Sequence, residues 1–303
     1  MEPRLNETPS VSPPTPTWSE EKSVSPTVLA FRRFRKNKLA LAGIVFLSFI
    51  VLVAIFADVI ATHDPTASQL SKIEAKADGE NWLGTDGSGR DNFSRLVYGA
   101  RISLTVGFFA MLFTVLIGGT LGSIAGYYGG KIDSVIMRFT DIVLIFPFIL
   151  LFMTIVAILE RTTVPIFILV IAITSWPQVC RILRGTFLSI REKEYVLSAR
   201  SIGCSDWRII RKHFLPNAVG PIIVNATIVM ATMIVAESAL SFIGFGVPQP
   251  TPTWGNMLTE AQSVRLLRNN PEAWLPPGLC ILLTVLSINF IGDGLRDAFD
   301  SKA

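Results

Sequence analysis

The sequence contains few cysteines, few histidines and few charged residues. There are three Cys and two His among 303 residues, and 17% of the residues are charged, compared with about 25% in an average soluble domain. Three Cys are too few for a disulfide-rich secreted scaffold. The two histidines, His63 and His213, lie far apart in the sequence, which argues against a histidine-based metal or catalytic site. The shortage of charge argues against an ordinary soluble enzyme.

A phosphate-binding loop is also missing. The nearest match to the P-loop pattern, residues 125–132, has neither the first Gly nor the final Ser or Thr that the pattern requires. We therefore expect no catalytic residues, no metal site and no cofactor in this chain. If the protein drives transport, the energy must come from a partner.

Apolar residues, by contrast, are abundant and occur in long runs. Half of the residues are hydrophobic, and the mean hydropathy is +0.50. Six runs approach the ~20 residues that a membrane-spanning helix needs. They are residues 39–57, 102–127, 134–159, 164–180, 219–241 and 277–295. We therefore predict an all-α polytopic membrane protein with six transmembrane helices.

The predicted organisation follows these runs. A cytosolic tail, residues 1–38, is disordered in its Pro-rich first part and basic thereafter, and a first span extends over 39–61. An external loop, 62–101, leads to a core of five spans, 102–297, with a long inner loop at 187–217. The predicted cytosolic C-terminus is 298–303.

Basic residues determine the predicted orientation. Six spans that start inside place 19 of the 27 Lys and Arg in inner segments and their flanks, and the remaining eight outside. This excess of positive charge on the inner side supports a cytosolic location for both termini.

The inner loop is long for a chain with short connections, and its first half predicts a helix. Tyr195, Ala199 and Ile202 share one helical face. Gly203 is suited to end that helix in the left-handed conformation.

The second half of the inner loop predicts another short helix. Ser205 suits its N-cap, and Trp207, Ile210 and Phe214 form an apolar stripe at helical spacing. Pro216 would end this helix because proline lacks a backbone N–H. A basic helix beside a membrane is, by itself, more typical of lipid contact than of protein docking.

The spacing within the inner loop resembles the EAA loop of ABC importer permeases. The residues at the corresponding spacing are Ser198, Ala199, Gly203, Leu215 and Pro216. Leu197, Ser198 and His213 stand where that motif has Glu, its first Ala and Ile. Three further segments, 82–104, 237–255 and 292–300, are similar to segments of the oligopeptide, dipeptide and nickel permeases, in the subunit encoded second of the pair.

The resemblance implies a type I ABC importer permease fold and a place in the bacterial cytoplasmic membrane. It implies that a homologous permease completes the translocation path and that two cytosolic ATPases bind ATP and Mg²⁺. An extracellular or periplasmic solute-binding protein would deliver the peptide substrate. No nucleic acid is expected among the partners.

The resemblance also implies that the inner loop contacts an ATPase and couples ATP-driven closure to movement of the helices. The small side chain of Ala199 would permit close approach, and Gly203 would set the angle between the two short helices. The expected coupling residues are Leu197, Ser198, Ala199, Arg200, Gly203, Cys204, Ser205, Asp206, Leu215 and Pro216.

Glycines and prolines within the spans predict packing and bending. Gly118, Gly122 and Gly126 lie four residues apart on the second span, which gives a smooth face for a neighbouring helix. Pro147 and Pro177 predict kinks in the third and fourth spans.

Ionisable residues within the spans leave alternatives open. Arg138 and Asp141 are three residues apart and can pair with each other on one helical face. Structural pairing, or anchoring at the inner interface, is favoured over contact with the substrate. Glu237 follows the apolar part of the fifth span near its outer end. An acid there either faces the translocation path or the binding protein, or accepts hydrogen bonds from the loop that follows.

We therefore predict the permease subunit of an ATP-driven oligopeptide importer. Import of dipeptides or nickel chelates is the alternative within the same family, and no residue decides between them. A secondary carrier or channel would need a stripe of ionisable residues in the middle of the spans. A membrane-embedded hydrolase would need a catalytic constellation there.

Overall fold

The computed structural model describes residues 31–159 and 162–299, and this part of the chain is all-helical. Five helices within it are long and apolar enough to cross a membrane, and a bent pair, α5 and α6, makes a sixth candidate span. The five are α2 (Lys38–Ile55), α4 (Asn92–Tyr128), α7 (Val164–Arg191), α10 (Leu215–Phe242) and α13 (Pro271–Phe299). The predicted all-α fold is confirmed, and the spans number six when the bent pair counts as one. The first 27 residues, predicted to be disordered, lie outside the described part.

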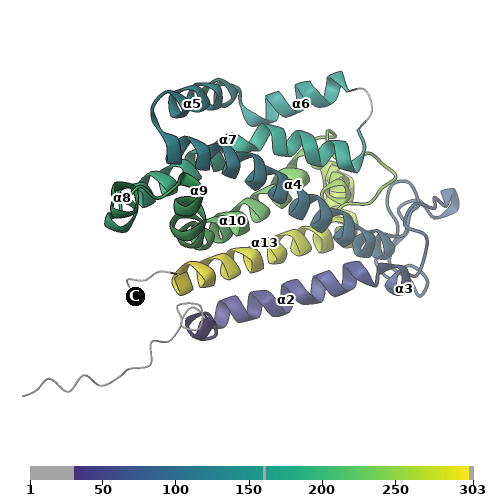
Figure 1. The fold of residues 1–303 in the computed structure, drawn as a ribbon. Helices are drawn as coiled ribbons and strands as arrows, with labels where there is room; N and C mark the ends of the chain where they lie inside the picture. Colours follow the sequence, from purple (N-terminus) through teal and green to yellow (C-terminus); the bar gives the residue numbers. More distant parts are fainter. Residues whose placement is uncertain (1–30, 160–161, 300–303) are drawn as a thin grey trace, which may run out of the picture.

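The long helices lie side by side (Figure 1). In this view α2 lies on one side, α5 (Gly130–Ile145) and α6 (Phe148–Ile158) on the other, with α4, α7, α10 and α13 between. The most extensive helix contacts are α4 with α7, α10 with α13, and α13 with α2.

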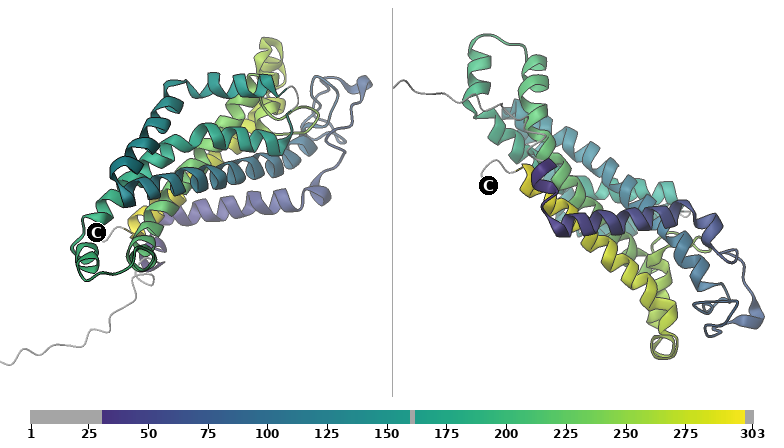
Figure 2. Two further views of the ribbon diagram at one scale, coloured as in Figure 1. Left: turned by 45° about the horizontal axis from the view of Figure 1, so that its top comes forward. Right: turned by 90° about the horizontal axis from the view of Figure 1, so that it is seen from below.

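Short helices gather at the two ends of the long ones (Figure 2). At one end are α8 (Glu194–Ser201) and α9 (Asp206–Ile209) of the inner loop. Towards the other end are α3 (Ala57–Ile60), η1 (Leu70–Lys72), α11 (Trp254–Met257), η3 (Leu258–Gln262) and α12 (Val264–Asn269). We call these the inner end and the outer end.

The predicted close packing of the second span is confirmed. Gly118, Gly122 and Gly126 all lie against α7. A Cβ atom on Gly118 would lie 2.5 Å from the carbonyl oxygen of Trp176, and one on Gly126 would lie 2.6 Å from Cβ of Phe187. The glycines therefore set the distance between α4 and α7.

The helix α4 begins earlier than the apolar run predicted. The Asp91 side chain caps it by accepting a hydrogen bond from the backbone N–H of Ser94 at 2.7 Å. Residues 92–101, predicted as external loop, form its first turns. With 37 residues the helix is about 55 Å long at 1.5 Å per residue, so it extends well beyond a hydrocarbon core of ~30 Å.

Buried ion pairs order the outer segment before α4. Asp86 pairs with Arg90 at 2.7 Å and with Arg95 at 3.4 Å, and all three are almost completely buried. Glu260 lies beside them and accepts a hydrogen bond from the backbone N–H of Gly87 at 3.4 Å. Burial, and then the nearby Asp86, raise the pKa of the Glu260 carboxyl. The stability of this network should therefore fall as the pH rises from the ordinary pKa of the carboxyl towards its raised value.

The third span is broken rather than kinked. The angle between α5 and α6 is 83°, and Phe146 before Pro147 has the extended backbone that a following proline favours. Pro177, in contrast, lies inside the single helix α7.

The predicted pairing of Arg138 with Asp141 is wrong. Asp141 pairs instead with Arg181 at 2.6 Å, because α5 packs against α7. Asp133, on the same helix as Asp141, accepts a hydrogen bond from Arg184 of α7 at 2.6 Å. Sequence spacing within one helix did not reveal these partners on a neighbouring helix.

Candidate functional site

The inner loop turns sharply at Gly203. The residue has a φ of +78°, as the sequence predicts. The N–H of Gly203 donates to the carbonyl of Arg200 at 2.9 Å, and the N–H of Cys204 donates to the carbonyl of Ala199 at 3.1 Å. This pair of bonds is the Schellman motif, which ends a helix and favours glycine at the left-handed position.

The second predicted helix is not a separate element. α9, the π turn η2 (Ile210–Phe214) and α10 follow one another without a break. Pro216 therefore does not end a helix. The N–H of Leu215 donates to the carbonyl of Ile210, five residues earlier. Through this wider π turn the helix continues past Pro216, although the proline has no N–H to donate. Ser205 occupies the N-cap position but makes no capping hydrogen bond through its side chain in the described structure.

The buried faces of the inner loop differ from the predicted stripes. Val196, Ala199, Ile209 and Phe214 are buried and pack in a cluster with Tyr127 and Phe187 at the inner ends of α4 and α7. The predicted members Tyr195, Ile202 and Trp207 are exposed. The small side chain of Ala199 thus permits close packing within this chain.

Tyr127, the penultimate residue of α4, joins both arms of the inner loop. Its hydroxyl donates to an oxygen of Asp206 at 2.6 Å, and the Arg200 guanidinium lies 5.2 Å from its ring centre. Its ring also packs edge-on against Phe214, with centres 5.0 Å apart. The sequence gives no sign of this role of Tyr127, because the residue lies 79 positions from its partner Asp206.

We expect Tyr127→Phe to loosen the inner loop, because it keeps the ring and removes one hydrogen bond. The loss of about 1 kcal/mol should raise the rate of tryptic cleavage after the exposed Arg208 and Arg211 about fivefold. Limited proteolysis of the purified protein measures this. Tyr128→Phe, at a half-exposed neighbouring ring, is the matched control, and equal cleavage in both variants would contradict the prediction.

Apolar side chains are exposed on the inner loop, and the basic residues Arg208 and Lys212 line the same hollow as one of them, Ile202. Leu197, Ile202 and Trp207 have 46%, 80% and 71% of their surface exposed. Exposed apolar groups with a polar rim are typical of protein interfaces. We call these three residues, together with Gly203 between them, the apolar tip.

A hollow of about 590 Å³ lies between α8 and the start of the next helix. Arg208, Lys212 and His213 form a basic wall on one side, and Tyr195 and Ser198 lie on the other. The His213 and Tyr195 rings are 5.7 Å apart. This surface has the shape and charge to receive an acidic or apolar projection of another protein.

The predicted coupling residues divide by exposure. Exposed are Leu197, Ser198, Gly203, Ser205, Asp206, Leu215 and Pro216; half-buried are Arg200 and Cys204; Ala199 is buried. Ile202 and Trp207, which are not among these ten residues, are also exposed on the inner loop.

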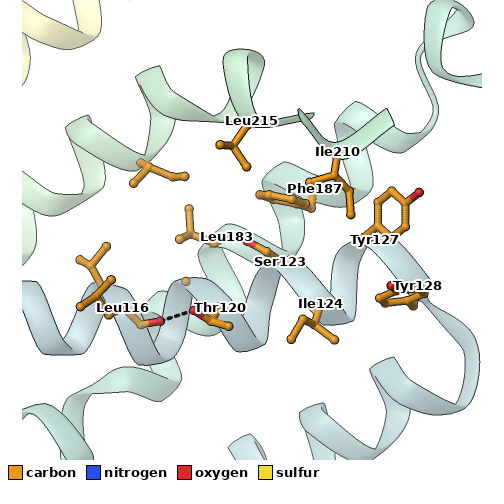
Figure 3. A pocket seen from close by; sticks show the side chains of 13 residues that line it. Leu116, Thr120, Ser123, Ile124, Tyr127, Tyr128, Leu183, Phe187, Ile210 and Leu215 are labelled. Carbon is orange, nitrogen blue, oxygen red and sulfur yellow. Dashed lines mark hydrogen bonds between the residues drawn. The ribbon is translucent and has the colours of Figure 1, made fainter. Parts of the chain in front are cut away.

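An apolar groove of about 400 Å³ lies behind the inner loop, between α4, α7 and the π turn. Figure 3 shows Tyr127, Phe187 and Ile210 at one end of this groove, and Leu116 and Thr120 of α4 further along. The Thr120 hydroxyl donates to the carbonyl of Leu116 at 2.6 Å. Since its lining is almost entirely apolar, the groove has little that would bind a polar solute.

Glu237 does not face any open path in this structure. Its side chain is completely buried and accepts hydrogen bonds from the hydroxyls of Ser241 at 2.7 Å and Ser103 at 3.3 Å. Ser103 in turn accepts a hydrogen bond from the backbone N–H of Trp254 at 3.1 Å. The arrangement joins α4 and α10 to the segment after α10, which agrees with the hydrogen-bonded alternative for Glu237.

Metal-binding geometry is absent from residues 31–159 and 162–299. No three His, Cys, Asp or Glu side chains there are grouped so that they could hold a metal ion. The three cysteines are all free.

Two family profiles match the chain. The family described as binding-protein-dependent transport system inner membrane component matches residues 118–303. The N-terminal TM domain of oligopeptide transport permease C matches residues 25–77.

Curated relatives match over nearly the whole chain. The dipeptide transport system permease protein DppC of Alkalihalophilus pseudofirmus is 43% identical over 300 residues, which cover 99% of this chain and 97% of that protein. The oligopeptide transport system permease protein OppC of Bacillus subtilis is 38% identical, with coverage of 93% and 92%. The glutathione transport system permease protein GsiD of Pectobacterium atrosepticum is 39% identical, with 90% of both chains covered.

A solved structure shares the fold. A chain of the MetNI methionine ABC transporter in an inward-facing conformation superposes with a TM-score of 0.57. The match has 20% sequence identity and covers 69% of this chain and 97% of that chain.

Proposed function

Because the chain belongs to the family of binding-protein-dependent transport system inner membrane components, in the branch of C-type oligopeptide and dipeptide permeases, we propose that it imports oligopeptides. The protein is a multi-pass permease of the bacterial inner membrane and works in a complex with ATPases and a partner permease. It is not an enzyme, and it has no cofactor of its own, since ATP is hydrolysed by the ATPases. Family membership sets aside the carrier, channel and hydrolase alternatives.

Oligopeptides are proposed as the substrate because the relatives described above are named for transport of peptides of different kinds. Their names give a dipeptide, an oligopeptide and the tripeptide glutathione. An external binding protein would deliver the peptide to the outer end, where segments 62–91 and 243–262 lie and where Leu70 and Trp82 are exposed.

In the proposed orientation the inner end and both termini are cytosolic. Two features support this. The helices α2 and α13 begin and end, respectively, at the end of the molecule where α8 lies (Figure 1). The basic residues of the inner loop fit the excess of positive charge expected on the cytosolic side.

In the proposed mechanism the apolar tip docks on an ATPase. The exposed Ile202 and Trp207 would enter its groove, and the basic wall beside them would meet acidic groups. Movement of the docked loop would reach α4 through the Tyr127 hydrogen bond and α10 through the continuous helix from Asp206 onward. The exposure of Ile202 and Trp207 at the inner end, 80% and 71%, is the observation that carries this proposal.

Purification of the tagged chain in mild detergent tests the function. We expect it to recover a second permease and P-loop ATPases. In proteoliposomes, ATP hydrolysis should rise when a peptide-loaded binding protein is added, and labelled peptide should accumulate only with ATP. Recovery of the chain alone, with flux that needs no ATP, would contradict the proposal.

A further inference from the structure

A second hollow, of about 410 Å³, opens between α4, the α5–α6 break, α7 and α10. It differs from the apolar groove because polar side chains lie along it. They are Thr114, Thr174, Ser175, Gln178, Asn225 and Thr232. Among the described residues that line it, none is charged. We call it the polar hollow.

The polar hollow lies at mid-membrane depth. Thr114, Phe146 and Thr232 line it and lie near the middle of the apolar runs 102–127, 134–159 and 219–241. Gln178 lies nearer the inner end of its own run, 164–180, and its side chain is exposed in this chain. An amide exposed within an apolar run is better placed against protein or water than against lipid. This face of α7 therefore meets protein or water.

The break in the third span lies at the same hollow. Phe146 and Pro147 interrupt the helix there and line the hollow. Non-helical backbone at membrane depth occurs where it is buried in protein or lines a water-filled cavity, not where it faces lipid. The break thus points independently to the same face.

Two polar groups in the wall of the hollow lack partners among the described residues. Asn225 is 8% exposed, and its Oδ1 accepts no hydrogen bond; the Thr114 hydroxyl is completely buried and also has no partner. Buried polar atoms are rarely left unpaired. Both atoms are closed off in this structure, whereas the Gln178 side chain on the same wall is exposed and offers hydrogen bonds without charge.

We propose that the polar hollow is the part of the translocation path that this chain contributes, and that it binds main-chain amide groups of the passing peptide. Gln178 and Asn225 carry both donors and acceptors, which match peptide N–H and C=O groups. The absence of charge among the described lining residues suits peptides with different side chains. The proposed path does not include Glu237, which is buried where α10 meets α4. The inference rests on the proposed function and names the site where it is carried out.

Thiol labelling of the assembled transporter tests the position of the path. Thr232→Cys should react with a charged, membrane-impermeant methanethiosulfonate reagent about tenfold faster than Val45→Cys, with the modified site located by mass spectrometry. Val45 is 70% exposed in the middle of α2, on the side opposite α5 and α6 (Figure 1). Equal rates at the two sites would overturn the proposal.

Uptake of tri-alanine by the complete transporter in proteoliposomes tests peptide binding. Gln178→Leu and Asn225→Leu should each lower kcat/KM for uptake about fivefold to tenfold, the effect of losing one hydrogen bond to a desolvated group. Thr120→Val, in the apolar groove, should leave uptake unchanged. Gln178 is exposed, so its variant should fold normally, and unchanged uptake in that variant would overturn peptide binding at this wall.

The two proposals fail separately. A wild-type complex that takes up no peptide would contradict the proposed function. Labelling of Thr232→Cys reports whether water reaches this position, whether or not the complex takes up peptide. Fast labelling supports the position of the path, and slow labelling refutes it.

Discussion

Gly203→Trp is expected to abolish ATP-driven peptide uptake while the protein remains inserted in the membrane. No atom of the described residues lies within 4 Å of a Cβ placed on Gly203, so a large side chain would point away from the chain. It would project from the apolar tip between Ile202 and Trp207, both exposed. A non-glycine residue with this φ costs only about 1–2 kcal/mol, which is too little to unfold the protein.

Gly203→Asn is the matched control, since asparagine tolerates the left-handed conformation better than other residues and is much smaller than tryptophan. It should keep most of the uptake and of the peptide-stimulated ATP hydrolysis, at an equal amount of protein in the membrane. Proteoliposomes with the partner permease, the ATPases and the binding protein give both readings. Normal uptake by the tryptophan variant, or equal loss in both variants, would contradict docking through the apolar tip.

Gly118→Leu should strongly destabilise the folded protein. Even a Cβ there would lie 2.5 Å from the carbonyl oxygen of Trp176 and 2.9 Å from Cβ of Val179. Since backbone atoms of α7 cannot rotate out of the way, α4 and α7 would have to separate. Overpacking of this kind costs about 3 kcal/mol or more, and we expect a lower melting temperature and a lower yield from membranes.

Gly185→Leu provides the comparison on α7 itself. A Cβ on Gly185 meets no described atom within 4 Å, and leucine has a higher helix propensity than glycine. This variant should therefore melt at or above the wild-type temperature. If the Gly118 and Gly185 variants melted at the same temperature, the glycine face would not determine the packing of α4 on α7.

The spans could be predicted because lipid requires long apolar surfaces, but their ends could not. A change in hydropathy marks the membrane surface, but the helices extend beyond it. The helix α4 begins at Asn92, and the fifth span continues a helix that begins at Asp206. The break at Pro147 was underestimated because the residues next to it on both sides, 142–146 and 148–151, are all apolar, and only their packing shows that α5 and α6 diverge.

Spacing predicted the sharp turn in the inner loop, but not which of its side chains are buried. The sequence placed Tyr195, Ala199 and Ile202 on one helical face, whereas Ala199 is buried and the other two are exposed. Which face of a short helix is covered depends on its packing against α4 and α7, and the sequence of the loop does not show this packing. Gly203 was predicted correctly because a left-handed turn depends on local backbone chemistry.

Contacts between distant segments left no signal in the sequence. Tyr127 and Asp206 are 79 residues apart, and Asp141 meets Arg181 only because α5 lies on α7. The polar hollow was missed for the same reason, since its residues come from four separate spans and none is charged.

The continuous helix α4 connects events on the two sides of the membrane. Its outer part holds Ser103 and the hydrogen bond to Trp254, and its inner end holds Tyr127. If this rod of about 55 Å tilts by about 5°, one end moves by about 5 Å relative to the other. Thermodynamic reciprocity then applies: if docking inside changes the affinity of a partner outside by some factor, docking outside must change the affinity inside by the same factor.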